Sequence, residues 1–104
     1  MFVGRYERKV QRGGWLRFPK DWLPFIGDRR SVFVMPDPDK NRSLLVVTSN
    51  DFNSEHLETR AKCAEKVNVT ADGRMQISAN LLAYAGIKNE AHFIGSIRTI
   101  TLTD

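Results

Sequence analysis

The chain contains the stretch Val10-Gln11-Arg12-Gly13-Gly14-Trp15-Leu16-Arg17-Phe18-Pro19, and 59 positions later it contains Val69-Thr70-Ala71-Asp72-Gly73-Arg74-Met75-Gln76-Ile77-Ser78. The matched positions are Val10 with Val69, Gly14 with Gly73, Leu16 with Met75, Phe18 with Ile77, Leu23 with Leu82 and Gly27 with Gly86. Each copy has the same order: a strand, a tight glycine turn, a second strand and a short helix that ends at a glycine. A half of roughly 50 residues buries too little apolar surface to fold alone, so the copies should pack on each other. We therefore interpret the protein as two copies of one β-β-α-β unit.

The glycine turn of each copy is predicted to join two strands as a tight hairpin. Residues 1–11 alternate, with Phe2, Tyr6 and Val10 on one face, which is typical of a half-buried strand. Glycine adopts positive φ without steric cost, so Gly13-Gly14 between apolar segments favours a turn, and Asp72-Gly73 is the same signal. The return strands are expected at 15–18 and 74–77.

Proline, serine and glycine mark the helix ends. Pro19 is expected to open a helix that Pro24 keeps short or distorted. Ser78 is expected to cap a second helix that ends at Gly86. The other expected elements are strands at 31–35, 43–48, 66–70, 91–94 and 97–102, a break at 49–51 and a linker helix at about 54–65. The result is a single domain, with repeat 1 at about 1–50 and repeat 2 at about 66–104.

The composition is that of a mildly basic globular protein. Its 104 residues include 16 Lys and Arg against 12 Asp and Glu, a net charge of +4, which permits nucleic-acid contact but also suits an ordinary solvated surface. Cys63 is the one cysteine, so no disulfide forms within the chain, and a lone thiol fits a reducing cytoplasm. No apolar run approaches the ~20 residues of a membrane span, and the N-terminus lacks a signal-peptide core. We expect a cytoplasmic protein without membrane contact.

Two parts of the chain resemble the MraZ proteins, bacterial transcriptional regulators of the AbrB-like (SpoVT-AbrB) superfamily. Residues 1–6 (MFVGRY) resemble the MFxGxY start of that family, and residues 71–78 (ADGRMQIS), followed by LLAYAGI and FIG, resemble its second repeat. The resemblance implies a mainly β fold with short helices, namely a double-split β-barrel built from two pseudo-symmetric β-β-α-β repeats. It also implies assembly into rings, an association with cell division and cell wall genes, and binding to repeated DNA boxes through loops that carry Asp and Arg four positions apart.

The family's loop signature is altered in this chain. Gln11 and Trp15 occupy the places of Asp and Arg in the first repeat, and Thr70 and Arg74 occupy them in the second. Arg74 is therefore the leading candidate for a DNA contact, because a guanidinium suits both a phosphate and the edge of guanine. The alternative is an exposed arginine that pairs locally with Asp72.

Further candidates surround the first turn. Arg12 is placed to reach a phosphate, and Trp15 to stack on a base or fill an interface pocket. Alternatively, Trp15 covers the barrel mouth or packs on Trp22. A basic stripe is also expected, formed by Arg5, Lys9, Arg17 and Arg12. The alternative for this stripe is a row of solvated charges that protects a sheet edge.

Signs of an enzyme are weak. His56 and His92 have no nucleophile in a catalytic motif, and Cys63 is interpreted as a small packing residue. Asp37 and Asp39 are interpreted as turn residues rather than metal ligands. We expect no catalytic residue, metal, cofactor or small-molecule substrate.

The leading hypothesis is an MraZ-like DNA-binding regulator that acts as a dimer or ring in the cytoplasm, associated with the nucleoid. The second is a degenerate relative that has lost DNA recognition and serves as an assembly or protein-interaction module, which Trp15 in the arginine position favours. A third and weaker hypothesis is an AbrB-like antitoxin, which predicts a disordered partner-binding tail. The target sequence, the oligomer size and the regulated genes do not follow from the sequence.

Overall fold

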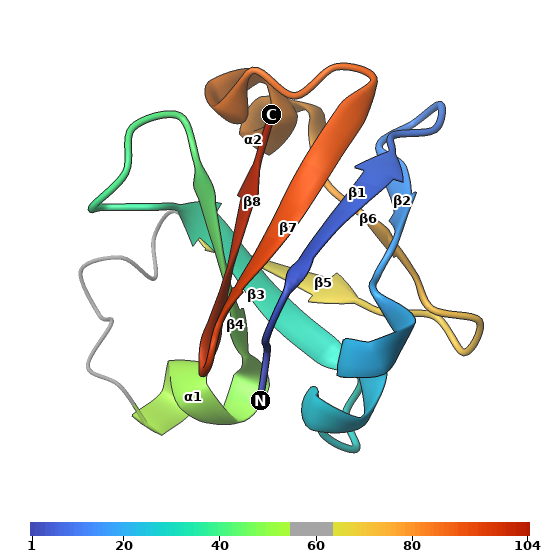
Figure 1. The fold of residues 1–104 in the computed structure, drawn as a ribbon, viewed down its shortest axis with the longest axis vertical. Helices are drawn as coiled ribbons and strands as arrows, with labels where there is room; N and C mark the ends of the chain where they lie inside the picture. Colours follow the sequence, from blue (N-terminus) through green and yellow to red (C-terminus); the bar gives the residue numbers. More distant parts are fainter. Residues whose placement is uncertain (55–63) are drawn as a thin grey trace.

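Strands form most of the regular structure in the computed structural model, which describes residues 1–54 and 64–104 (Figure 1). The described elements are β1 (Arg5–Lys9), β2 (Trp15–Arg17), the 3-10 helix η1 (Lys20–Phe25), β3 (Ser31–Pro36), β4 (Leu44–Thr48), α1 (Ser49–Ser54), β5 (Glu65–Asn68), β6 (Arg74–Gln76), α2 (Ala79–Ala85), β7 (Glu90–Ser96) and β8 (Thr99–Thr103). The prediction of a mainly β fold with short helices is confirmed.

The strands form one large and one small antiparallel sheet. The large sheet has six strands in the order β1-β7-β8-β4-β3-β5, and the small sheet pairs β2 with β6. Within the described ranges β1 and β5 are the edges of the large sheet and do not pair with each other. The large sheet is therefore not closed into a barrel.

The partner of each return strand differs from the expectation. We expected β2 to pair along β1, but β1 pairs with β7, and β2 pairs with β6 from the other copy. Hairpin pairing at the first turn is limited to one bridge, in which the Gln11 amide donates to the Trp15 carbonyl at 2.7 Å. The exchange of partners places Leu16 directly opposite Met75, and both are buried. Burial of this apolar pair is the physical reason for the crossing.

The helix ends follow the local chemistry with one small correction. Pro19 precedes η1 rather than beginning it, and Pro24 lies within η1, which forms a 3-10 helix. The Ser78 hydroxyl accepts a hydrogen bond from the Leu81 amide at 3.3 Å, and Gly86 ends α2 in the left-handed conformation with φ of 68°. The predicted cap and stop of α2 are confirmed.

The linker helix begins earlier than expected. We expected a break at 49–51 and a helix at about 54–65, but α1 spans Ser49–Ser54 and β5 begins at Glu65. The Thr48 hydroxyl accepts a hydrogen bond from the Asp51 amide at 3.2 Å, so Thr48 caps α1 as soon as β4 ends. The rest of the expected linker helix lies at 55–63, outside the described residues.

The core is centred on Trp22. Its ring packs edge-on against four other aromatic rings, those of Phe2, Tyr6, Phe18 and Phe93, with centroid distances of 5.0–6.2 Å. The indole nitrogen donates to the Val3 carbonyl at 3.1 Å, which satisfies its only polar atom. This cluster joins η1 to the inner face of the large sheet.

Candidate nucleic-acid interface

The two-stranded sheet of β2 and β6, here called the ribbon, has one inner and one outer face. Leu16 and Met75 point inward and are buried. Alternation along a strand then sends their neighbours to the outer face. The outer residues are Trp15, Arg17, Arg74 and Gln76, with Trp15 opposite Gln76 and Arg17 opposite Arg74.

The two glycine turns flank this ribbon and have matching hydrogen bonds. In the first turn, the Gly14 amide donates to the Gln11 carbonyl at 3.0 Å. In the second turn, the Gly73 amide donates to the Thr70 carbonyl at 2.9 Å. Each turn is also tied to the other copy, because the Ile77 amide donates to the Gly14 carbonyl at 2.9 Å and the Phe18 amide donates to the Gly73 carbonyl at 2.8 Å. The turns and ribbon therefore form one connected surface.

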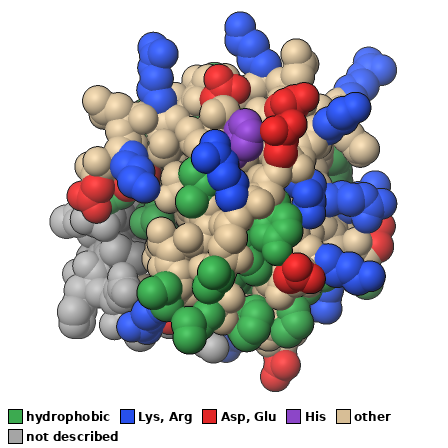
Figure 2. Space-filling model, in the orientation of Figure 1, with side chains coloured by type: hydrophobic (Ala, Val, Ile, Leu, Met, Phe, Trp, Pro, Cys, Tyr) green, Lys and Arg blue, Asp and Glu red, His purple; other side chains and the backbone are tan. Residues whose placement is uncertain are grey.

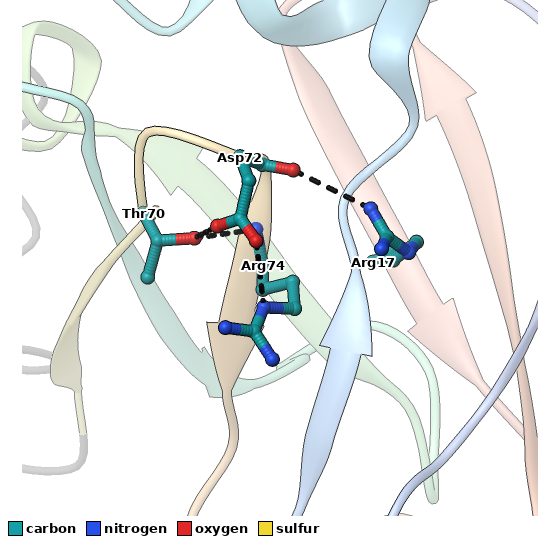
Figure 3. Close-up of polar contacts among 4 residues, drawn as sticks. All are labelled: Arg17, Thr70, Asp72 and Arg74. Carbon is teal, nitrogen blue, oxygen red and sulfur yellow. Dashed lines mark hydrogen bonds and ion pairs between the residues drawn. The ribbon is translucent and has the colours of Figure 1, made fainter.

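Arg74 pairs locally and remains exposed. Its Nε lies 3.1 Å from Asp72 Oδ2, its guanidinium carbon lies 5.6 Å from the centre of the Trp15 ring, and its side chain is 44% exposed. The Thr70 hydroxyl donates to the Asp72 carboxylate and accepts from the Arg74 amide at 2.9 Å (Figure 3). These contacts hold the guanidinium over the indole ring. The ion pair engages Nε, and no other described residue forms a hydrogen bond with the terminal nitrogens, which are left for a ligand.

The Asp72 carboxylate is held in its charged form. The hydrogen bond from Thr70 is the main cause that lowers the pKa of Asp72, and the nearby Arg74 charge lowers it further. At neutral pH, Asp72 therefore neutralises part of the charge on Arg74.

Arg17 faces Arg74 across the ribbon. Like charges directly opposite each other on paired strands are unfavourable. The Arg17 Nη1 donates to the Asp72 backbone carbonyl at 3.5 Å, a long contact, and its side chain is exposed (Figure 3). An anion above the ribbon would relieve the repulsion between the two guanidinium groups.

The remaining predicted contacts divide between two places. Arg12 is exposed in the first turn and belongs to the ribbon surface, together with Trp15, which is half-buried. Arg5 and Lys9 are exposed on β1, at the edge of the large sheet. The structure therefore brings Trp15, Arg17 and Arg74 together, with Arg12 in the turn at the Trp15 end of the ribbon. The expected single stripe across paired strands is wrong, because β1 pairs with β7 and β2 with β6. Figure 2 shows Lys and Arg side chains gathered on the side of the molecule where β1, β2 and β6 lie.

Trp15 does not pack on Trp22. The ring contacts of Trp22 are those with Phe2, Tyr6, Phe18 and Phe93, whereas Trp15 lies beside Arg74 and lines a shallow hollow with Lys66 and Gln76. The alternative in which Trp15 packs on Trp22 is wrong.

Two cations near the ribbon were not predicted. Arg8 and Lys20 line a cleft together with Arg17, beside the second turn. Arg8 continues the alternation of Phe2, Tyr6 and Val10 in residues 1–11. A charged residue within this apolar alternation was the signal that could have identified it.

The other candidate residues contribute no site in the parts of the chain that are described. No group of three or more His, Cys, Asp or Glu is placed to hold a metal there. The Asp37 carboxylate accepts from the Asp39 amide at 2.9 Å, as a turn residue does. His92 lies 3.1 Å from the Glu7 carboxylate, while His56 and Cys63 fall outside the described residues.

None of the described helices is long and apolar enough to cross a membrane. No protein-family model and no curated protein matches this chain.

Proposed function

We propose that this protein is a DNA-binding transcriptional regulator of the MraZ type that acts as an oligomer in the cytoplasm, associated with the nucleoid and directed at cell division and cell wall genes. The observation that carries the proposal is the outer face of the ribbon, where Arg17 and Arg74 stand opposite each other beside Trp15. A two-stranded β-ribbon has the dimensions to enter the major groove of DNA. Arginine binds phosphate or the guanine edge there, and tryptophan offers a stacking surface.

The proposal includes the architecture that the resemblance implies, a double-split β-barrel of two pseudo-symmetric repeats. The order of the large sheet supports it. If each strand is replaced by its counterpart in the other repeat (β1 by β5, β7 by β3 and β8 by β4, and the reverse), the strand order is the same when it is read from the opposite edge of the sheet. The register of the strands supports it as well. Tyr6 stands opposite Phe93 in the pairing of β1 with β7. The residues at the equivalent positions of the other repeat, Glu65 (59 after Tyr6) and Val34 (59 before Phe93), also stand opposite each other. The crossed pairing of β2 and β6 then lies on the axis that relates the repeats.

Self-association would multiply weak contacts. One ribbon per subunit offers few cations, so a single subunit gains little affinity from phosphate neutralisation. A dimer or ring that presents several ribbons to repeated DNA boxes gains affinity through effective concentration.

The test is a DNA-binding titration by fluorescence anisotropy at several salt concentrations. The probe is a duplex with repeated boxes from upstream of the protein's own gene, compared with a scrambled duplex. We expect Arg74→Ala to weaken binding to the repeat duplex by roughly 1–3 kcal/mol, as for loss of one specific arginine contact. Lys40→Ala, which removes a cation from the exposed β3–β4 turn, is the matched control and should leave binding unchanged. Affinity that does not depend on salt, or that survives Arg74→Ala, would contradict the proposal.

The second candidate function is an assembly or protein-interaction module without DNA recognition. It is favoured by Trp15, which is half-buried against Arg74. It is also favoured by apolar side chains exposed elsewhere, namely Met1, Val3, Phe25 and Ile97. Stable oligomers that show no affinity for the repeat duplex would support this candidate over the first.

A further inference from the structure

A cleft beside the ribbon gathers three cations whose counterparts in the second repeat are uncharged. It has a volume of about 410 Å³ and lies between η1 and the second glycine turn. Arg8, Arg17 and Lys20 line it, Phe18 and Leu23 supply an apolar part of its wall, and the turn 71–73 closes one side. This volume falls in the range of sites that bind small organic ligands, which begins at roughly 300 Å³.

None of the three cations forms an ion pair with a carboxylate of the described residues. The ion pairs in the described ranges join Arg74 to Asp72, His92 to Glu7 and Arg98 to Asp51. Asp72 also lines the cleft, but its carboxylate is bound by Thr70 and Arg74, and only its backbone carbonyl is directed at Arg17 (Figure 3). The cleft therefore presents excess positive charge.

Arg8 is held in place by neutral contacts. Its guanidinium carbon lies 5.3 Å from the centre of the Tyr6 ring, and its Nη1 donates to the Glu7 carbonyl at 2.9 Å. The Tyr6 hydroxyl in turn donates to the Asp21 carboxylate at 2.9 Å. Arg8 is half-buried and keeps further N–H donors for a ligand in the cleft.

The other repeat shows that the scaffold forms without these charges. Addition of 59 to the positions of Arg8, Arg17 and Lys20 gives Val67, Gln76 and Ala79, all uncharged. Gln76 makes the contact that Arg17 makes, because its Nε2 donates to the Gly13 carbonyl at 2.8 Å just as Arg17 donates to the Asp72 carbonyl. A neutral side chain therefore performs the structural task of Arg17, so that contact does not require its positive charge.

We propose that the cleft of Arg8, Arg17 and Lys20 is a phosphate site that holds one backbone phosphate of the bound DNA strand. This inference rests on the proposed function and extends it, because it adds a contact beside the ribbon. The two guanidinium groups and the ammonium group donate to the phosphate oxygens. The apolar wall at Phe18 and Leu23 lies against the attached deoxyribose.

The test uses substitutions that the chain itself already carries in its other repeat. Lys20→Ala introduces the residue found at Ala79, and Arg17→Gln introduces the residue found at Gln76, so both variants should fold. We expect inorganic phosphate to shift the backbone amide signals of residues 71–73 in a nitrogen–proton NMR titration, and the double variant to lose these shifts. Lys40→Ala is the control that removes one charge elsewhere and should retain them.

The DNA arm measures the affinity for the repeat duplex against salt in wild type, Lys20→Ala and Lys40→Ala. Loss of one phosphate contact should reduce the slope of log K against log salt by about 0.9, and weaken binding about tenfold near 0.1 M salt. Because Lys20 lies outside the ribbon, this result separates the cleft from the contacts of Arg74.

The two arms distinguish failure of this inference from failure of the proposed function. Salt-dependent DNA binding with a slope that Lys20→Ala leaves unchanged would overturn the cleft and leave the proposed function standing. Absence of DNA binding by the wild type would overturn both the proposed function and the placement of a DNA phosphate in the cleft. Phosphate-induced shifts that survive in the double variant would also overturn the site.

Discussion

Gly14 is the residue at which the crossing of the two repeats is most tightly constrained. Its φ is +84°, and a Cβ there would lie 2.3 Å from the Ile77 carbonyl oxygen. Gly13 has nearly the same φ, +86°, but a Cβ there would meet nothing nearer than a Trp15 ring atom at 3.5 Å. A substitution at Gly13 therefore measures the free-energy cost of a left-handed backbone alone, whereas the same substitution at Gly14 adds the cost of a clash with the backbone.

We expect Gly13→Ala to destabilise the protein by roughly 1–2 kcal/mol, the cost of a left-handed alanine. Gly14→Ala should cost this amount and at least about 2 kcal/mol more, because the Ile77 carbonyl must move and the adjacent hydrogen bond from the Ile77 amide to the Gly14 carbonyl is lost. Urea unfolding followed by tryptophan fluorescence measures both free energies. Equal losses in the two variants would contradict the close approach of the repeats at Gly14.

The carboxylate of Asp72 makes a pH-dependent contribution. The hydrogen bond from Thr70 and then the charge of Arg74 lower its pKa in the folded state. A lowered folded-state pKa means that the charged group stabilises the fold above its ordinary pKa, and that this stabilisation is lost as the pH falls through the folded value. We expect Thr70→Val to raise the pKa of Asp72 toward its ordinary value, as measured by NMR titration of the side-chain carboxyl carbon. An unchanged pKa would contradict the role given to the Thr70 hydrogen bond.

At the scale of elements, the sequence predicts local structure better than partners. The turns at Gly13-Gly14 and Asp72-Gly73, the Ser78 cap and the Gly86 stop were predicted because each depends on the conformational preference of one or two residues. The start of α1 was missed although Thr48 and Asp51 stand at the spacing of an N-cap and its third helical residue. Reading 49–51 as a break was wrong because polar residues suit a helix start as well as a loop.

Strand partners were the larger error. Alternation in 15–18 shows which side chains are buried but contains no information on which strand lies beside them. The choice of β6 over β1 depends on Leu16 meeting Met75 across roughly sixty residues of chain, a contact that only the complete core determines. The same error placed Arg17 in a stripe with Arg5 and Lys9, whereas the structure sets it opposite Arg74 and beside Arg8 and Lys20.

At the scale of the whole molecule, the cations of the ribbon and cleft lie in a different place from the exposed apolar side chains. The ribbon and its cleft carry the clustered cations near β1, β2 and β6, whereas exposed apolar side chains gather where the N-terminus meets η1 and the β7–β8 turn (Figure 2). Met1, Phe25 and Ile97 line one hollow there, and all three are more than half exposed. This separation suits a protein that assembles through one side and presents the other to DNA.

Ile97 is the residue through which this arrangement is best tested. Its φ is +65° and it is 59% exposed, so a β-branched side chain is held in a left-handed conformation with little burial in return. Phe2 and Ile97 exchange two backbone hydrogen bonds of 2.8 Å, which keep this conformation in place. Strain of this kind at an exposed apolar residue points to a contact outside the subunit.

We expect Ile97→Asn to have opposite effects on the subunit and the assembly. Asparagine tolerates the left-handed region, so the free energy of unfolding of the dilute subunit should rise by roughly 1 kcal/mol. Loss of the apolar contact should at the same time shift the mass measured by light scattering toward the monomer, and Phe25→Gln should do the same without the gain in stability. Tyr84→Gln removes an exposed aromatic ring from α2, away from the hollow, and should leave the mass unchanged. Two results would show that this side of the molecule is not the assembly surface: a wild-type mass in both Ile97→Asn and Phe25→Gln, or a wild type that is monomeric at every concentration. In the second case the ribbon would have to bind DNA without the gain in affinity from linked copies.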